Sequence, residues 1–305
     1  MNVATNNDIY QRITDRIIEQ IEAGTPPWIR PWSDVNDTAP INIMSNRAYR
    51  GINNVMLNLE AQSKGYPLNR WATYRQATER GAQVRKGESA TQIVYYQLRK
   101  LAATGDAFPD HVETDIPERI IPLLRVYSVF NVAQVDGLPT ELLEVPVPVE
   151  PFAAQEAADD LLLDSGVPIY HGGFRAFYSP SEDRIQLPVK TLFKDAGNYY
   201  AAALHELVHA TGHGTRCNRQ LTTRFGTESY AAEELIAELG AAFLCAHCHI
   251  DGQLQHASYL SSWLSVLRQD KRAIFVASTK AQQAADYLIS KTQPQPVPVT
   301  EALAA

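Results

Sequence analysis

Hydrophobic and polar positions alternate with helical spacing in the first segment of the chain. Isoleucines stand at positions 9, 13, 17 and 21, four residues apart, with polar residues between them. This spacing places one apolar stripe along a helix, so the sequence predicts an amphipathic helix over residues 7–23 that ends at Gly24. We expect the stripe to pack into a core.

Two later segments have the pattern of strands. Residues 83–96 contain the turn VRKGE followed by TQIVYY, and residues 120–131 contain LLRVYSVFN. Both patterns predict strands, and the polar, acidic residues 101–118 between them predict a flexible loop. A helix followed by mixed elements and strands indicates an α+β domain, which we assign to residues 1–136.

The second half of the chain has mainly helical patterns. Prolines alternate with Val and Glu before it, so residues 137–152 predict a stiff linker and a domain boundary. A second domain is expected over residues 153–292, and the Pro- and Gln-containing residues 293–305 predict a disordered tail. The elements expected in the second domain are a helix over 151–165, a turn and short strand over 178–188, and helices over 197–213, 231–245 and, as a pair, 257–290.

The segment AAALHELVHATGH, residues 201–213, carries a metal-binding pattern. His205 and His209 are four residues apart, so in a helix both imidazoles project from nearly one face and can hold one metal ion. Glu206 lies beside that face and can reach a water on the metal rather than the metal itself. The pattern therefore predicts a zinc hydrolase site, with two histidine ligands and Glu206 as the general base.

A catalytic zinc site needs a third protein ligand. A metzincin would have a histidine where this chain has Thr215, so that class is disfavoured. The helix expected downstream contains Glu234 and Glu238, four residues apart on one face. A carboxylate from a second helix is the gluzincin arrangement, and we expect Glu234 as the ligand and Glu238 as the group that orients a ligand histidine. Glu238 is the alternative ligand, and a solvated helix face is the alternative explanation of the pair.

Other candidate groups in the second half are less specific. Peptide hydrolysis needs an oxyanion stabiliser; Tyr230, His213 and Arg224 are candidates, and the sequence does not choose between them. The run CAHCH over residues 245–249 matches no recognised zinc finger, which favours buried thiols over a second zinc site. Three cysteines are too few for a disulfide framework and suit a reducing compartment.

Charge is distributed unevenly along the chain. The formal net charge is -7, yet residues 1–100 carry 13 Lys/Arg against 9 Asp/Glu, whereas residues 137–305 carry 12 against 19. This asymmetry suggests an anionic partner for the first part only. The chain has no signal-type opening and no run of eighteen apolar residues, so we expect a cytoplasmic protein without a membrane partner.

Aromatic and cationic residues are interleaved through the first hundred positions. Single-stranded nucleic acid is held by a cationic groove that follows the backbone and by aromatic faces on which unpaired bases stack. The mixture is therefore compatible with a single-stranded DNA-binding domain, although buried aromatics and solvated arginines would give the same composition. The candidate DNA-binding residues are Arg47, Tyr49, Arg50, Trp71, Arg85 and Lys86.

Longer motifs occur in both halves. The first half contains PWIRPW, RAYRGIN, WATYRQ, VRKGE and VFNVAQ; the second contains DRIQLP, HELVHATGH, RFG and EELIAE. Jointly, over residues 5 to about 290, these motifs resemble ArdC-type antirestriction proteins. The first half is also similar to the N-terminal domain of conjugative primases, which supports single-stranded over double-stranded DNA.

The resemblance implies a plasmid-encoded protein that binds single-stranded DNA and protects DNA entering a new host by conjugation from restriction. It also implies a zincin-like metallopeptidase domain, with His205 and His209 as ligands, Glu206 as base, and the third ligand open among the three glutamates of EELIAE. We expect Zn²⁺, with another divalent ion such as Mn²⁺ as the alternative, and a restriction-related host protein as a candidate substrate. The competing hypothesis is a non-catalytic protein that coats single-stranded DNA and whose metal site is structural.

Overall fold

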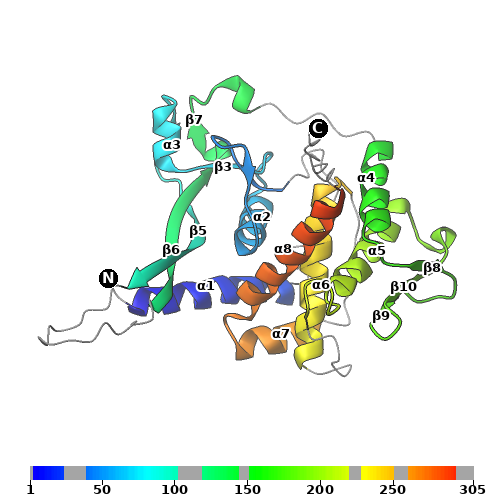
Figure 1. The fold of residues 1–305 in the computed structure, drawn as a ribbon. Helices are drawn as coiled ribbons and strands as arrows, with labels where there is room; N and C mark the ends of the chain where they lie inside the picture. Colours follow the sequence, from blue (N-terminus) through cyan, green and yellow to red (C-terminus); the bar gives the residue numbers. More distant parts are fainter. Residues whose placement is uncertain are drawn as a thin grey trace, which may run out of the picture.

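The computed structural model describes most of the chain (Figure 1); the described residues are 3–23, 39–101, 119–143, 151–219, 228–250 and 260–292. The flexible loop, the middle of the linker and the tail expected from the sequence lie mainly or wholly outside these ranges. Elements of the first half are α1 (Val3–Glu22), β1 (Ile41–Asn42), β2 (Arg47–Ala48), α2 (Ile52–Lys64), β3 (Arg70–Ala72), α3 (Tyr74–Glu79), β4 (Gln83–Val84), β5 (Thr91–Leu101), β6 (Arg119–Asn131), η1 (Val132–Gln134), β7 (Val135–Asp136) and η2 (Thr140–Leu142).

The second half contains α4 (Pro151–Asp164), β8 (Ile169–His171), β9 (Phe177–Ser179), β10 (Arg184–Leu187), η3 (Lys190–Leu192), α5 (Ala196–Thr211), α6 (Glu228–His247), α7 (Leu260–Gln269) and α8 (Ala273–Thr292). The first helix, both long strands, the short strand at β10 and the five helices expected in the second half are therefore confirmed, with ends that differ by a few residues. The predicted α+β class is confirmed as well.

A five-stranded sheet in the order β2-β1-β3-β6-β5 organises the first half. Its largest part is the antiparallel ribbon of β5 and β6, which pair from Thr91 opposite Val129 to Leu101 opposite Arg119. Successive side chains of β5 point to opposite faces. Ile93 therefore lies in a small cluster with Val129, while Val94 joins the helices on the other face.

Helices form most of the second half. α5 packs against α6, α6 packs against α8, and α4 covers both α5 and α8. A three-stranded sheet in the order β8-β10-β9 lies beside this bundle, with β9 at its edge and in contact with α5 (Figure 1). Because α5 packs against α4, α6, α8 and the small sheet, its orientation relative to α6 is fixed.

The core of the second half extends into α1 and α2. The isoleucine stripe of α1 is buried in the same cluster as Trp263 of α7 and Phe275 of α8. The rings of Tyr10 and Phe275 meet edge to face, with centroids 4.6 Å apart. α1 therefore packs as a partner of α7, and α2 contacts α8. The domain limits 1–136, 137–152, 153–292 and 293–305 stay predictions.

None of the helices within the described ranges combines the length and apolar character that a membrane crossing requires.

Candidate metal centre

The local structure of α5 fixes the three groups of the HELVH motif. The helix begins after Asp195, whose carboxylate accepts the Asn198 N–H at 2.8 Å. Its last carbonyls are satisfied from outside the helix: Arg216 donates to Ala210 O at 2.7 Å and Arg219 to Val208 O at 2.7 Å. With both ends capped, the motif lies in regular helix, so its two histidines share one face.

Three ligand atoms converge between α5 and α6. The Nε2 atoms of His205 and His209 are 3.2 Å apart. Glu234 of α6 places one carboxylate oxygen 3.4 Å from the first nitrogen and the other 3.6 Å from the second. Tetrahedral coordination with bonds of about 2.0–2.2 Å separates neighbouring ligand atoms by about 3.3–3.6 Å. The spacing therefore fits a single divalent cation held by two imidazoles and a carboxylate.

Each histidine has a second carboxylate behind it. Glu238 lies 3.4 Å from Nδ1 of His205, and Glu233 lies 3.3 Å from Nδ1 of His209. Such partners hold an imidazole in the orientation that presents its other nitrogen to a metal. Glu234 is thus close to the Nε2 atoms of both histidines, and Glu238 is close to Nδ1 of His205. The assignment of metal ligands itself stays a prediction.

Sequence reasoning missed the group that holds Glu233. Arg219 contacts both of its carboxylate oxygens, at 2.8 Å and 3.0 Å, and also donates to Thr211 Oγ1 at 2.8 Å. The guanidinium is almost fully buried, so its charge is matched directly by this carboxylate. Arg219 was indistinguishable in the sequence from a surface arginine after a helix, because its partner comes from a different helix.

The electrostatics of the cluster favour positive charge between the two helices. Burial disfavours the imidazolium form of His205, but hydrogen bonding to Glu234 and Glu238 outweighs burial and raises its pKa to about 10. The same balance, with Glu233 and Glu234 as partners, raises the pKa of His209 to about 9. Burial likewise opposes the charged form of Glu234, yet the two histidines hold its pKa well below the usual range. A metal cation can supply the positive charge that protons otherwise provide.

Glu206 points toward the edge strand. Its Oε2 accepts the backbone N–H of Tyr178 in β9 at 2.8 Å. The Tyr178 hydroxyl in turn donates to Asp183 at 2.6 Å, and Arg216 contacts both of these side chains. The hydrogen bond from Arg216 is the main reason that the pKa of Asp183 falls to about 2. This network fixes β9 against the C-terminal end of α5.

The three oxyanion candidates are placed differently. Tyr230 lies near the start of α6, one turn before the glutamates. His213 follows α5, with Nδ1 2.9 Å from Thr215 Oγ1. Arg224 lies outside the described residues. Their role stays a prediction.

The buried thiols expected after α6 are confirmed. Cys245 and Cys248 are buried, and burial raises the pKa of Cys248 to about 12. Among the described residues, the one group that could hold a metal is His205, His209 and Glu234.

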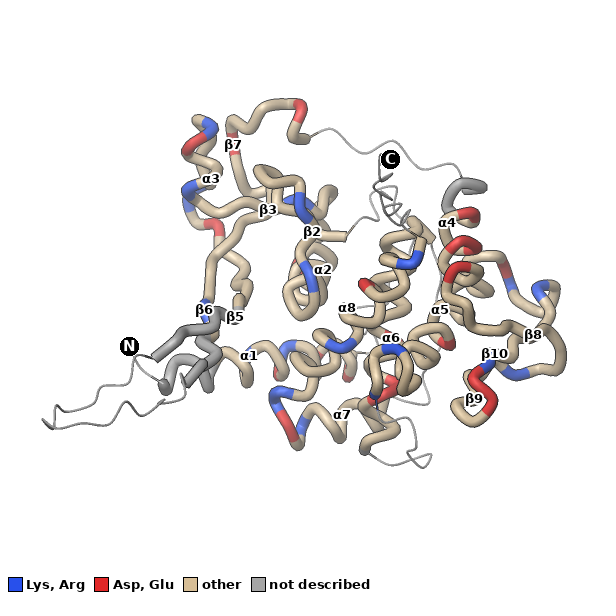
Figure 2. The backbone as a smooth tube through the Cα atoms, in the orientation of Figure 1, with Lys and Arg blue, Asp and Glu red and all other residues tan. Residues whose placement is uncertain are grey.

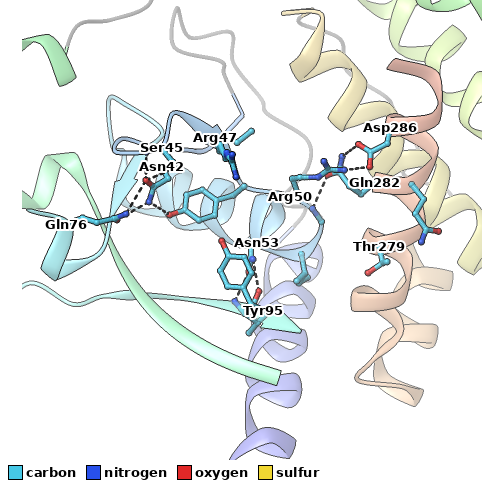
Figure 3. Close-up of a pocket in the computed structure, with 16 residues that line it drawn as sticks. Asn42, Ser45, Arg47, Arg50, Asn53, Gln76, Tyr95, Thr279, Gln282 and Asp286 are labelled. Atoms are coloured by element: carbon cyan, nitrogen blue, oxygen red, sulfur yellow. Dashed lines mark hydrogen bonds and ion pairs between the residues drawn. The ribbon is translucent and has the colours of Figure 1, made fainter. Parts of the chain in front are cut away.

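The DNA-binding candidates fall into distinct settings. Arg47, Tyr49 and Arg50 line a cavity between the first half and α8 (Figure 3). Arg85 is exposed but pairs with Glu88 and Asp136. Lys86 is exposed. The expectation for Trp71 needs correction as a stacking residue, since a buried ring offers no face to a base: its side chain is 0 % exposed and its indole N–H donates to Asn69 at 2.8 Å.

Tyr95 lines the cavity and is 48 % exposed, and its ring meets that of Tyr127, which is 43 % exposed, edge to face at 5.6 Å. Figure 2 shows that acidic positions gather on α4 in the second half, while a basic position occurs at β2, whose Arg47 lines the cavity. Cationic and aromatic groups therefore meet on the first half of the molecule, away from the acidic face of α4.

Comparisons with known proteins agree with this picture. A family model described as the N-terminal domain of anti-restriction factor ArdC matches residues 7–130. A model described as a zincin-like metallopeptidase matches residues 156–280. The zincin-like part of the predicted fold is thereby confirmed.

Among curated proteins, y4eC of Sinorhizobium fredii is 41% identical over 290 residues, covering 93% of this chain and 92% of that protein. Two DNA primases TraC of Escherichia coli are 39% and 37% identical, but the chain spans only 27% and 21% of their lengths.

Two solved structures of the antirestriction protein ArdC from plasmid R388 are similar over nearly the whole chain. The metal-free form is 40% identical, has a TM-score of 0.77 and covers 93% of this chain and 98% of that one. The Mn(II)-bound form, also 40% identical, has a TM-score of 0.75 and covers 94% and 99%. A divalent metal is thus bound by a relative of the same overall fold.

Proposed function

The chain belongs to the ArdC family of antirestriction proteins, and we propose from this premise that it binds single-stranded DNA and protects DNA arriving by conjugation from host restriction. The similarity to TraC primases, over a segment of those longer proteins, supports an association with conjugative transfer. Three cysteines are too few for a disulfide framework, which is compatible with action in the cytoplasm of the recipient cell.

The second half of the proposal is a metal-dependent peptidase activity. The observation that carries it is the convergence of His205, His209 and Glu234 at coordination spacing, with Glu206 beside them. These three groups would hold Zn²⁺ or Mn²⁺. When bound, such an ion supplies Lewis-acid polarisation of a carbonyl and makes a water molecule more acidic.

The protein's own groups have separate tasks in this proposal. Glu206 takes a proton from the attacking water and delivers it to the leaving amine. Glu233 and Glu238 hold the two imidazoles in place, and Arg219 fixes Glu233. The edge strand β9, beside α5, could accept an extended peptide by strand addition. The substrate required is a protein of the recipient cell.

A transfer assay tests the proposal. An unmodified plasmid is conjugated into a restricting recipient in the presence of the wild type, Glu206→Gln or the control Glu156→Gln, which alters an exposed glutamate of α4. We expect the wild type and the control to protect, and Glu206→Gln to lose the part of protection that depends on hydrolysis. Equal protection by all three would refute the peptidase proposal.

The alternative function is a non-catalytic coat for single strands with a structural metal. One observation favours it: the backbone N–H of Tyr178 already holds the carboxylate of Glu206. This alternative predicts full protection by Glu206→Gln and loss of thermal stability on metal removal. Point variants are preferable to a first-half fragment, because α1 and α2 lose their packing partners when α7 and α8 are deleted.

A further inference from the structure

A cavity of about 720 Å³ lies between the first half and α8 (Figure 3). Its walls come from the β1–β2 turn, the start of α2, the strand β5 and one face of α8. The volume is within the range of about 300–1,000 Å³ that is typical of small-ligand sites. The cavity is thus large enough for one nucleotide.

Several polar groups of the cavity are already committed to holding its shape. The side-chain amide of Asn53 donates to the carbonyl oxygen of Val94 and accepts the Val94 N–H, at 2.8 Å each. Asn42 donates to the hydroxyl of Tyr49 and to Gln76, at 3.1 Å each. These bonds make the walls rigid, which suits a preformed site.

Other groups of the cavity remain accessible to a ligand. Tyr95 has a half-exposed ring, and Arg47 is exposed and has no ion-pair partner among the described residues. Arg125 stands opposite Tyr95 on β6, and directly opposed residues share a face of the sheet. An aromatic face flanked by guanidinium groups fits a base with its phosphates.

The side formed by α8 closes the cavity through two contacts. Arg50 pairs with Asp286, and the backbone N–H of Gly51 donates to Gln282 Oε1 at 3.1 Å. Among the described residues that line the cavity, Asp286 is the acidic one. Its carboxylate forms an ion pair with Arg50, whose guanidinium would otherwise be available to a phosphate.

We propose that this cavity binds one unpaired nucleotide of a DNA strand, with the base stacked on Tyr95 and the phosphates near Arg47, and that Asp286 competes with phosphate for Arg50. The inference rests on the proposed single-stranded DNA binding and assigns part of that binding to one cavity. It also makes α8, an element of the zincin-like half, one wall of the DNA site.

The first test replaces the stacking ring. Tyr95→Ala is compared with Tyr74→Ala, because Tyr74 is equally exposed, at 49 %, but does not line the cavity. Binding of fluorescein-labelled oligodeoxythymidylate is followed by fluorescence anisotropy. Loss of one stacked base predicts roughly 5- to 150-fold weaker binding for Tyr95→Ala. Tyr74→Ala and Tyr95→Phe, which keeps an aromatic face, are expected to bind like the wild type.

The second test releases Arg50. Asp286→Asn should bind the oligonucleotide more tightly, and the slope of log affinity against log salt should become steeper by about 0.7, the value for one added phosphate contact on a single strand. Glu79→Gln is the control, since it releases Arg75 outside the cavity. A merely structural role of Asp286 predicts no gain in affinity.

The results separate the two levels of the proposal. If the wild type does not bind the oligonucleotide, the proposed DNA binding fails and this inference fails with it. If the wild type binds, but Tyr95→Ala behaves like Tyr74→Ala or Asp286→Asn gives no tighter binding than Glu79→Gln, only the cavity assignment is overturned. Circular dichroism of each variant verifies that the fold is intact.

Discussion

Gly240 allows α6 to approach α5 closely at the candidate metal centre. A Cβ at this position would lie 2.8 Å from both Cγ atoms of Val208, the residue before His209. Carbon atoms pack comfortably at about 3.5–4.0 Å, so in Gly240→Ala the helices must separate locally by roughly 1 Å or Val208 must move. Because Glu234 is on α6 and the histidines are on α5, separation widens the spacing of the ligand atoms.

The magnitude follows from the strain. Overpacking a core site costs about 1–3 kcal/mol. The metal-free Gly240→Ala protein can relieve this strain by separating its helices, but metal binding restores the close approach and with it the strain. Metal affinity should therefore fall by about 5- to 150-fold, at about 1.4 kcal/mol per factor of ten. Metal-free stability should change less, since Ala gains up to about 1 kcal/mol over Gly in a helix.

Titration calorimetry with Zn²⁺ and Mn²⁺ measures the affinity, and urea unfolding measures the stability. Val208→Ala removes the two atoms that clash, so Gly240→Ala combined with Val208→Ala should recover the affinity of Val208→Ala alone. Gly214→Ala is the control, because its Cβ would meet only Asn218 Oδ1, at 3.8 Å. Unchanged metal affinity in Gly240→Ala, or no recovery in the double variant, would refute the reasoning.

Three further outcomes are expected. Glu233→Gln weakens the hold on the His209 imidazole and should lower metal affinity by about 10- to 100-fold in the same calorimetric assay. Asp183→Asn loses the ion pair with Arg216. Because the folded pKa of Asp183 is depressed to about 2, the ion pair stabilises the fold above the unfolded pKa of about 3.9, and this stabilisation is lost as pH falls toward 2. The difference in unfolding free energy between wild type and variant, measured by urea unfolding, should therefore narrow below about pH 4. Gly51 has φ +55°, so Gly51→Ala should cost about 1–3 kcal/mol in unfolding free energy, although its Cβ would meet only the Ser278 carbonyl oxygen, at an ordinary contact distance of 3.8 Å. A cost below about 0.5 kcal/mol, the size of a surface change, would contradict this prediction.

The predictable parts of the molecule are those with strong local periodicity. The isoleucine stripe of α1 and the HELVH spacing each define a helix face without knowledge of the rest of the fold. Glu234 could be singled out because two helices carrying a histidine pair and a carboxylate pair have few ways to combine. The proximity of these side chains could therefore be anticipated, including that of Glu238 to His205, whereas their roles at a metal stay predictions.

The remaining parts depend on tertiary contacts that leave no local pattern. Trp71 and Tyr95 are both aromatic residues among arginines, yet one is in the core and the other is half-exposed, because β3 is an inner strand of the sheet and β5 is at its edge. Nothing in the sequence indicates that Arg50 is paired, because its partner Asp286 comes from α8, more than two hundred residues later in the chain. Arg219 similarly acquires its role only when α6 brings Glu233 to it.

The pairing of α1 with α7 and α8 has a consequence for how the protein is made. α1 is synthesised before α7 and α8, whose Trp263 and Phe275 lie in the cluster that buries Ile13 and Ile17. Until α7 and α8 have been made, the apolar stripe of α1 lacks part of its packing surface, which is the condition in which chaperones bind and aggregation begins. A chain truncated before α7 should consequently be recovered in the insoluble fraction or bound to chaperones, even though the strands β1 to β10 have all been made.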